Sequence, residues 1–236
     1  MLRIVPTLDI DVLKITIKTL QISTEQVRNS MKQLYTHNYG LVILAAGNSS
    51  RMGQPKQLIK YHNKSFLQHA VDEANMATNN KTMVVTGANR DLLEVELRQL
   101  PVHVIYNEQW ETGIASSISN GVAALYKIFP YLYGIIICVC DQPFVSSPLL
   151  NKLIEQYKQG HKGIVASHYH DTLGVPVLFG KKYFDALLAL KGDEDIQTLL
   201  NEYTDDIEQI EFEQGNIDIN TMQDYEALLN SNKDVA

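Results

Sequence analysis

Two cations and several small residues lie close together between residues 44 and 56. Arg51 and Lys56 are the cations, and the small residues after Leu44 are Ala45, Ala46, Gly47, Ser49, Ser50 and Gly53. Small side chains let backbone N–H groups approach a polyphosphate closely. A guanidinium can bind two phosphate oxygens at once, and an ammonium neutralises charge as a mobile point charge. These residue types predict a phosphate-binding loop.

The spacing within this loop matches neither of two common nucleotide-binding motifs. The Walker motif needs Gly-Lys followed by Ser or Thr, and the dinucleotide motif needs Gly-x-Gly-x-x-Gly. Residues 44–56 contain neither pattern. A glycine-rich turn between a strand and a helix, without a bound phosphate, is the alternative interpretation.

A carboxylate follows a long apolar stretch later in the chain. Residues 133–140 are rich in β-branched side chains, and Asp141 comes directly after them. A strand that is apolar on both faces belongs at the centre of a sheet, so we expect Asp141 at the edge of that sheet. Mg²⁺ prefers one or two carboxylates together with phosphate and water oxygens. Asp141 is therefore a candidate Mg²⁺ ligand, and a turn-forming aspartate before Pro143 is the alternative.

A third informative stretch runs from Asn107 to Gly121. Gly113 predicts a turn, and Ser116 and Ser117 follow in the first turn of an expected helix. A helix N-terminus with small hydroxyls can hold an anion or the polar edge of a base. An ordinary N-capped helix, with Trp110 packed into the core, is the alternative interpretation.

The elements that must position these residues alternate between strands and helices. Expected strands include 58–61, 81–86, 102–106, 163–167 and 207–212. Helices are expected between them, and in the one over 91–100 the inward residues are expected to be Leu92, Leu93, Val95 and Leu97. This alternation is typical of right-handed βαβ units in an α/β fold with a mostly parallel sheet. Ligands of such folds bind at the carboxyl edge of the sheet.

Length and charge set further limits on the protein. The 236 residues suffice for one large α/β domain with a short appendage. We expect a short helical extension over residues 1–38, with an N-cap at 23–26, and the main domain over 39–236. The formal net charge of −7 argues against nonspecific binding to nucleic acid or to anionic membranes.

The cysteines and the targeting patterns of the sequence indicate in which cellular compartment the protein is expected. Cys138 and Cys140 alternate on one expected strand and should share a face, which favours a buried, reduced pair. The sequence has neither a signal-peptide layout nor an apolar run long enough for a membrane span. A cytoplasmic location is therefore expected.

The run from Leu44 to Leu58, Leu-Ala-Ala-Gly-x-Ser-x-Arg-Met-Gly-x-x-Lys-Gln-Leu, resembles a family signature. The family is that of the MobA-like nucleotidyltransferases, which include the molybdenum cofactor cytidylyltransferases. The resemblance covers about residues 39–230 in five ordered motifs. It implies a three-layer, Rossmann-like, mostly parallel sheet of the nucleotide-diphospho-sugar transferase type.

The resemblance also implies roles for individual residues. Arg51, Lys56 and Asp141 would be catalytic, and Mg²⁺ would be held by Asp141 and Asp218. The residues implied to bind the nucleotide are Leu44, Ala45, Ala46, Gly47, Ser49, Ser50, Arg51, Lys56, Gly113, Ser116 and Ser117. Those implied to form the acceptor pocket are Gln142, Pro143, Gly174 and Pro176.

The implied reaction is transfer of CMP from CTP to the phosphate of a molybdopterin-type cofactor, with release of pyrophosphate. Ala46 favours CTP, because guanylyl-transferring relatives typically carry Leu-Ala-Gly-Gly where this chain has Leu-Ala-Ala-Gly. A client molybdoenzyme would be a further partner.

Two departures from the family pattern keep other functions open. Asp195, Ile196 and Gln197 stand where cytidylyltransferases usually have Gly, Ala and Arg, and Asn220 replaces an Asp two positions after Asp218. The lost cation allows a different acceptor, such as a sugar phosphate or alcohol phosphate. The lost carboxylate allows a non-catalytic protein that binds and delivers a molybdenum cofactor.

Overall fold

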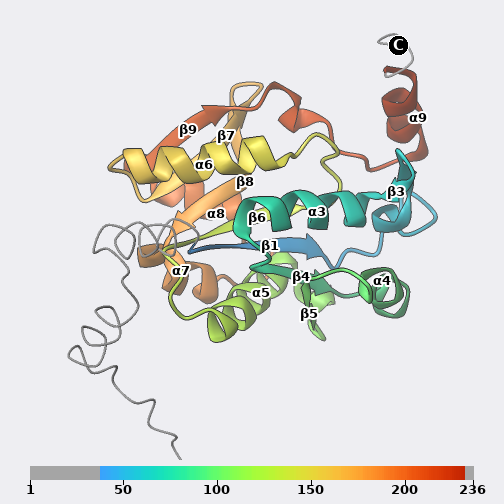
Figure 1. Ribbon diagram of the computed structural model, residues 1–236, viewed down its shortest axis with the longest axis horizontal. Coiled ribbons are helices and arrows are strands. Elements are labelled where there is room, and N and C mark those ends of the chain that lie inside the picture. The colour runs from blue at the N-terminus through green and yellow to red at the C-terminus, as the bar shows by residue number, and fades with distance from the viewer. Residues whose placement is uncertain (1–37, 232–236) are drawn as a thin grey trace, which may run out of the picture. The chain divides into compact units, whose positions relative to one another are not determined.

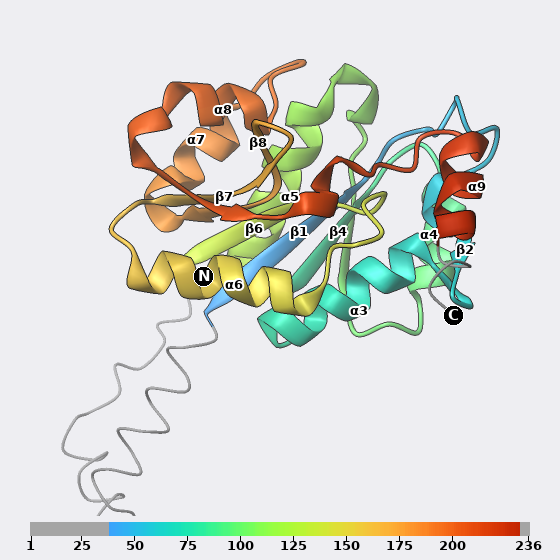
Figure 2. The ribbon, with the colours of Figure 1, turned by 90° about the horizontal axis from the view of Figure 1, so that it is seen from above.

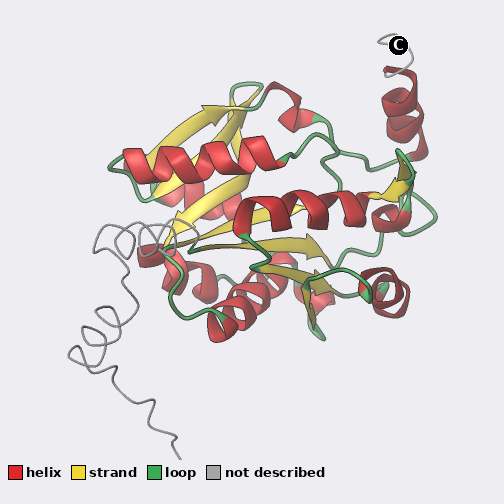
Figure 3. Cartoon of the chain, viewed as in Figure 1, coloured by secondary structure: helices red, strands yellow, loops and turns green. Residues whose placement is uncertain are grey.

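The computed structural model describes residues 38–231, and within this part of the chain seven strands form one sheet (Figures 1 and 3). Their order across the sheet is β5-β4-β1-β6-β8-β7-β9. The strands are β1 (Tyr39–Ala45), β4 (Thr82–Thr86), β5 (His103–Tyr106), β6 (Gly134–Val139), β7 (Ile164–Tyr169), β8 (Thr172–Gly180) and β9 (Ile207–Glu211). Only β8 is antiparallel to its neighbours in this sheet. The predicted mostly parallel α/β sheet is confirmed.

Helices cover both faces of the sheet, which gives three layers (Figure 2). The helices are α3 (Phe66–Thr78), α4 (Arg90–Leu97), α5 (Ile114–Ile128), α6 (Ser147–Gln159), α7 (Phe184–Ala189), α8 (Ile196–Glu202) and α9 (Met222–Ser231). Short 3₁₀ turns are η1 (Lys56–Leu58), η2 (Trp110–Thr112), η3 (Lys181–Tyr183), η4 (Thr204–Asp206) and η5 (Glu213–Asn216). Helices α3 and α6 lie on one face of the sheet, and α5, α7 and α8 lie on the other.

The core consists of two clusters, one on each face of the sheet. Leu41 and Ile43 of β1 pack into the cluster under α3 and α6, whereas Val42 and Leu44 pack into the cluster under α5. This division follows from the strand period of two, which sends successive side chains to opposite faces. The three-layer arrangement expected from the family resemblance is therefore present.

The parallel register brings the candidate site residues to one edge. Leu44 of β1 pairs with Val85 of β4 on one side and with Val139 of β6 on the other. Because the strands run in the same direction, the loop after β1 and the carboxylate after β6 leave the sheet side by side. The predicted position of the 44–56 loop at the carboxyl edge is confirmed.

Helix α4 differs from the expectation. Leu93 and Leu97 are buried, but Leu92 is 55% exposed and Val95 is 63% exposed. The expectation that all four face inward was wrong, because a helix packed on a flat sheet buries only one stripe, at i and i+4 spacing.

The strand expected over 58–61 is short and belongs to a small hairpin. Strands β2 (Lys60–Tyr61) and β3 (Lys64–Ser65) pair around His62 and Asn63, whose φ angles are 46° and 68°. Two central residues with positive φ are typical of a tight hairpin turn. The Tyr225 hydroxyl of α9 donates to the Lys60 carbonyl at 2.7 Å, so the C-terminal helix is tied to this hairpin.

The two cysteines are buried, free thiols in one core cluster, as predicted. Burial raises the pKa of Cys140 to about 12 and raises that of Cys138 further. Both thiols therefore stay protonated at neutral pH and serve as core packing.

Two further expectations concern the N-terminal extension and membrane-spanning helices. The helices predicted within residues 1–37 lie outside the described residues, so the division at residue 38 stays a prediction. Within residues 38–231 no helix is long and apolar enough to cross a bilayer.

Gly121 lets α5 lie directly on the sheet. A Cβ atom at this position would lie 2.6 Å from Cγ1 of Val42 and 2.6 Å from Cγ2 of Val85. In Gly121→Ala, overpacking should cost about 1–3 kcal/mol of unfolding free energy and helix propensity should return about 1 kcal/mol; because both contacts are far inside van der Waals distance, we expect a net loss of up to about 2 kcal/mol. Urea denaturation measures the difference.

A matched control lies two positions further along α5. Ala123 is exposed, so Ala123→Gly reports helix propensity alone and should cost about 1 kcal/mol. The more stable protein should then have alanine at position 123 and glycine at position 121. A Gly121→Ala variant that is as stable as the natural protein, or more stable, would contradict the close packing.

Candidate active site

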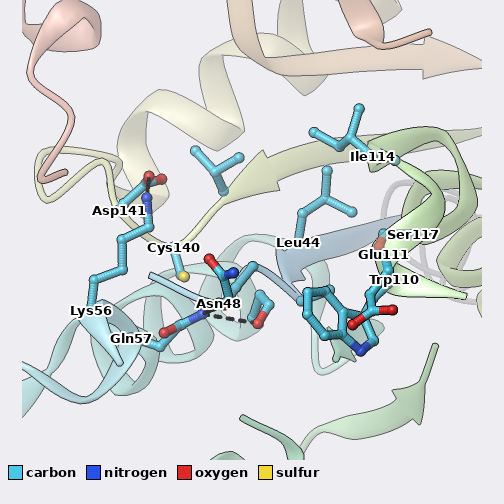
Figure 4. A pocket seen from close by; sticks show the side chains of 15 residues that line it. Leu44, Asn48, Lys56, Gln57, Trp110, Glu111, Ile114, Ser117, Cys140 and Asp141 are labelled. Carbon is cyan, nitrogen blue, oxygen red and sulfur yellow. Dashed lines mark hydrogen bonds and ion pairs between the residues drawn. The ribbon is translucent and has the colours of Figure 1, made fainter. Parts of the chain in front are cut away.

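A pocket of about 420 Å³ opens at the carboxyl edge of β1 and β6. Figure 4 shows Lys56 and Asp141 toward one end and Trp110, Glu111 and Ser117 toward the other. The sequence-predicted residues that line it are Leu44, Ala45, Ala46, Gly47, Lys56, Gly113, Ser117 and Asp141. Segments after three different strands thus meet around one cavity.

The cations of the loop converge on two oxygen-bearing side chains. The Lys56 ammonium is ion-paired with the Asp141 carboxylate and donates to Oδ1 of Asn220 at 2.9 Å. Nη2 of Arg51 donates to the same oxygen at 3.2 Å. Asn220 stands where the family pattern has a carboxylate. It connects both cations of the loop to the segment just before α9.

Asp218 lies near Asp141, because the backbone N–H of Ile219 donates to the Asp141 carbonyl at 3.0 Å. Burial and the negative charge of Asp141 raise the pKa of the Asp218 carboxyl. Both effects disfavour the ionised form, and a nearby cation would reverse them. The Lys56 ammonium at Asp141 shows that this position accommodates positive charge.

The donor set suits Mg²⁺. Asp141 and Asp218 offer carboxylate oxygens, and Asn220 offers an amide oxygen close to both cations. Among the residues that the structure describes, no group of three or more His, Cys, Asp or Glu side chains could hold a metal by itself. Two carboxylates are nevertheless what Mg²⁺ takes when phosphate and water supply its remaining ligands.

A buried glutamine shapes the loop after β1. Nε2 of Gln57 donates to the carbonyls of Ala45 and Gly47, each at 3.0 Å. Its Oε1 accepts from the Ser49 hydroxyl at 3.2 Å, and Ser49 Oγ accepts from the Lys56 N–H at 3.1 Å. Gln57 therefore sets the curvature of the whole loop, a role that its place beside Lys56 in the signature did not reveal.

Three residues of the predicted phosphate loop do not line the pocket. The Ser49 hydroxyl is used inside the loop, and Ser50 and Arg51 are exposed. The Arg51 side chain still reaches Asn220, the residue to which Lys56 also donates. The direct roles of Ser49 and Ser50 in nucleotide binding stay predictions.

The opposite wall depends on a buried asparagine. Nδ2 of Asn107 donates to the hydroxyls of Ser116 at 2.8 Å and Ser117 at 3.0 Å, and its Oδ1 accepts from the Gln109 N–H at 3.0 Å. Gly113 has φ +119°, and a Cβ there would lie 2.1 Å from the Gly192 carbonyl oxygen. The predicted glycine turn before α5 is confirmed, and Asn107 is the residue that fixes this wall.

The residues expected in the acceptor pocket lie elsewhere. Gln142 is buried, and its Nε2 donates to the Gly215 carbonyl at 2.8 Å. A Cβ at Gly174 would lie 2.0 Å from the Tyr169 hydroxyl, and the Pro176 carbonyl accepts from Ser167 at 2.7 Å. Pro143 is partly buried, and none of the four lines the 420 Å³ pocket. Their role toward an acceptor stays a prediction.

The departures at 195–197 have a structural explanation in part. Asp195 caps α8, because its carboxylate accepts from the Thr198 N–H at 3.2 Å while the Thr198 hydroxyl accepts from the Asp195 N–H at 3.3 Å. Gln197 is exposed and donates to Asn201 at 3.2 Å. Asp195 thus starts a helix, and Gln197 brings no positive charge to this segment.

Gln57 generates the first prediction for the site. Gln57→Met keeps the length of the side chain but leaves the carbonyls of Ala45 and Gly47 without their donor. We expect a loss of about 1–3 kcal/mol in unfolding free energy, the cost of an unsatisfied buried polar group, together with weaker nucleotide binding. Gln54→Met is the control, since Gln54 is exposed and its Nε2 donates to the Met222 sulfur at 3.9 Å, so no backbone carbonyl depends on that bond. Equal urea midpoints for the two variants would contradict the role of Gln57.

Asp224 generates a pH prediction. Its Oδ2 accepts from the N–H groups of Asn220 at 2.9 Å and Thr221 at 2.7 Å, and these bonds, with the nearby Arg51, hold the pKa of this carboxyl below its usual value. A depressed pKa stabilises the fold above the unfolded-state pKa of about 4 and loses that contribution as the pH falls through the folded value.

We therefore expect Asp224→Ala to lower the urea midpoint at pH 7 and to differ less from the natural protein at pH 3. Gln223→Ala, on the exposed side of the same helix, is the control and should show no such pH dependence. A gap between natural protein and Asp224→Ala that stays constant from pH 7 to pH 3 would contradict the assignment.

Comparison with known proteins places this geometry in a family. The family model of the MobA-like NTP transferase domain matches residues 41–207. Nicotine blue oxidoreductase of Paenarthrobacter nicotinovorans is 26% identical over 136 residues, which are 57% of this chain and 63% of that protein. The bifunctional protein GlmU of Francisella tularensis subsp. novicida is 26% identical over 168 residues, 69% of this chain and 35% of that protein. The chain thus spans less than two thirds of the length of either relative.

Solved structures show the same fold. Rv0371c of Mycobacterium tuberculosis H37Rv superposes with a TM-score of 0.72 at 27% identity, over 82% of this chain and 97% of that chain. Its complex with manganese has a TM-score of 0.67 at 25% identity, over 82% of this chain and 99% of that chain. The family match covers most of the chain, and the fold and the pocket agree with it. This chain belongs to the family of MobA-like NTP transferase domains.

Proposed function

We propose that this protein transfers CMP from CTP to the phosphate of a molybdopterin-type cofactor and releases pyrophosphate. The observation that carries the proposal is the placement of Lys56 and Asp141 at one end of a pocket lined by the small residues Ala45 to Gly47. Such a cavity offers close backbone approach, a cation for phosphate charge and a carboxylate for a metal. Membership of the MobA-like family supports nucleotidyl transfer as the reaction class.

Asp141 and Asp218 would hold Mg²⁺, and the ion when bound would neutralise phosphate charge and orient the triphosphate. The manganese complex of Rv0371c supports a divalent metal in this fold. Arg51 and Lys56 both donate to the Asn220 amide oxygen, so the Arg51 guanidinium lies just outside the pocket, near its Lys56 end. Their positive charges suit the pyrophosphate that leaves.

The reaction requires the two substrates to be positioned, and it requires no general base. An ionised oxygen of the acceptor phosphate attacks the α-phosphorus in line, so one P–O bond forms while the bond to pyrophosphate breaks. No proton needs to be removed from the acceptor, because its phosphate is already ionised at neutral pH. The loop shaped by Gln57 holds the triphosphate still, and Lys56 stabilises the charge that accumulates on the leaving group.

The acceptor and the cellular setting are the finer parts of the proposal. Gln197 brings no cation to the segment where cytidylyltransferases usually carry Arg, which favours as second candidate a transfer to a sugar phosphate or alcohol phosphate. A client molybdoenzyme and a cytoplasmic location stay predictions from the sequence. A non-catalytic delivery protein is the remaining alternative, and it differs by making no pyrophosphate.

Pyrophosphate release by the full chain tests the proposal. The assay contains Mg²⁺ and isolated molybdenum cofactor and compares CTP, GTP, ATP and UTP, with sugar phosphates as other acceptors. We expect release with CTP that requires the acceptor, and Asp141→Asn should lower it by about 100-fold or more, because it weakens the site for the Mg²⁺ ion that would neutralise the transferring charge. Asp185→Asn, an exposed substitution on α7, is the control and should not change the rate.

Each outcome has a distinct meaning. Release with sugar phosphates alone would replace the acceptor and keep the reaction class. Tight nucleotide binding without release from any acceptor would overturn catalysis in favour of the delivery protein. Equal rates for Asp141→Asn and Asp185→Asn would contradict the assigned site.

A further inference from the structure

We propose that Trp110 and Glu111 select the base of the nucleotide. The Trp110 indole would stack on the base, and the Glu111 carboxylate would accept a hydrogen bond from an exocyclic amino group. The inference rests on the proposed function, because it assigns a nucleoside triphosphate to the 420 Å³ pocket. It predicts a preference for a base that carries an amino group, such as cytosine, over uracil.

The position of the two residues supports this assignment. Trp110 and Glu111 line the same pocket as Lys56 and Asp141 but toward its other end (Figure 4). The pocket has the size of a small-molecule site. A triphosphate held at the Lys56 end therefore directs the nucleoside toward Trp110, across the backbone of the small-residue loop.

The backbone and Cβ atom of Trp110 are held in place by their surroundings. A Cβ atom at Gly87 would lie 2.8 Å from Cβ of Trp110, so the missing side chain at 87 lets the tryptophan pack directly on this loop. The turn that carries Trp110 is fixed from both sides. Asn107 accepts from the Gln109 N–H at 3.0 Å, and the Gln109 carbonyl accepts from the Thr112 N–H at 3.0 Å. An indole that is partly buried and attached to a well-held turn is a suitable stacking platform, since a tryptophan side chain has only two torsion angles to fix.

The polar groups at this end of the pocket complement an amino-bearing base. Ser117 Oγ accepts from Asn107 at 3.0 Å, which leaves the hydroxyl proton for a carbonyl oxygen of the base. Across residues 38–231 no side chain or backbone group forms a hydrogen bond or ion pair with the exposed Glu111 carboxylate. A carboxylate only accepts, so it favours the amino group of cytosine. Uracil has no amino group, and the N–H between its two carbonyls meets a carboxylate with repulsion on both sides.

The sequence makes one experiment direct, because Trp110 is the only tryptophan of the chain. Intrinsic fluorescence is titrated in the full chain with CTP, UTP and inorganic tripolyphosphate, with Mg²⁺ present. We expect CTP to change the emission and tripolyphosphate to compete with CTP without changing it. Affinities of variants are measured by equilibrium dialysis with labelled CTP.

Matched variants separate stacking from hydrogen bonding. Trp110→Ala should weaken CTP binding by about tenfold or more, the usual cost of a lost base–aromatic stack, and leave tripolyphosphate binding unchanged. Trp110→Phe should stay within about threefold, because an aromatic face remains. Glu111→Gln should lower the ratio of CTP to UTP affinity by about tenfold, the scale of one charge-assisted hydrogen bond. Glu108→Gln, an exposed neighbour outside the pocket, should not change it.

The inference is overturned if tripolyphosphate changes the emission as much as CTP does. It is also overturned if Trp110→Ala or Glu111→Gln leaves CTP affinity and the CTP to UTP ratio unchanged. Failure of the proposed transfer is a separate result: base-dependent binding without pyrophosphate release would retain the base site and reject the reaction. Absence of CTP binding would reject both.

Discussion

The parallel pairing of β1 with β6 is the constraint on which the candidate site depends. Leu41 to Ile43 and Ile135 to Ile137 are fully buried, so this pair cannot slip without moving apolar side chains to the wrong face. Parallel strands end at the same edge of a sheet. The phosphate loop that follows β1 and the Asp141 carboxylate that follows β6 therefore meet, although Lys56 and Asp141 are 85 positions apart in the sequence.

An acidic protein that binds polyphosphate must place its cations locally. The formal charge is −7, yet Lys56 in the pocket and Arg51 just outside it both donate to Asn220, and Lys56 is also ion-paired with Asp141. Partners of opposite charge or polarity keep a partly buried lysine oriented before a ligand arrives. The Asp224 carboxylate of α9 accepts hydrogen bonds from the N–H groups of Asn220 and Thr221. The position of Asn220, and with it the partner of both cations, therefore depends on α9.

Two buried amides shape the walls of the pocket. Gln57 bonds the carbonyls of the loop after β1, and Asn107 bonds the serine hydroxyls and the turn before α5. Each satisfies several polar groups that would otherwise be buried without partners. Sequence analysis left both without a role, because a single amide in a sequence carries no sign of which backbone groups it will reach.

The sequence alone determined the mostly parallel α/β class and the loop after β1, since apolar periodicity, glycine positions and a long signature depend on local residue types. It misjudged Leu92 and Val95, because periodicity does not tell how wide a stripe the sheet covers. Only the tertiary structure decided which side chains meet. Arg51 and Asn220 are 169 positions apart and share a hydrogen bond, and such a contact depends on the packing of every element between them rather than on any pattern near either residue.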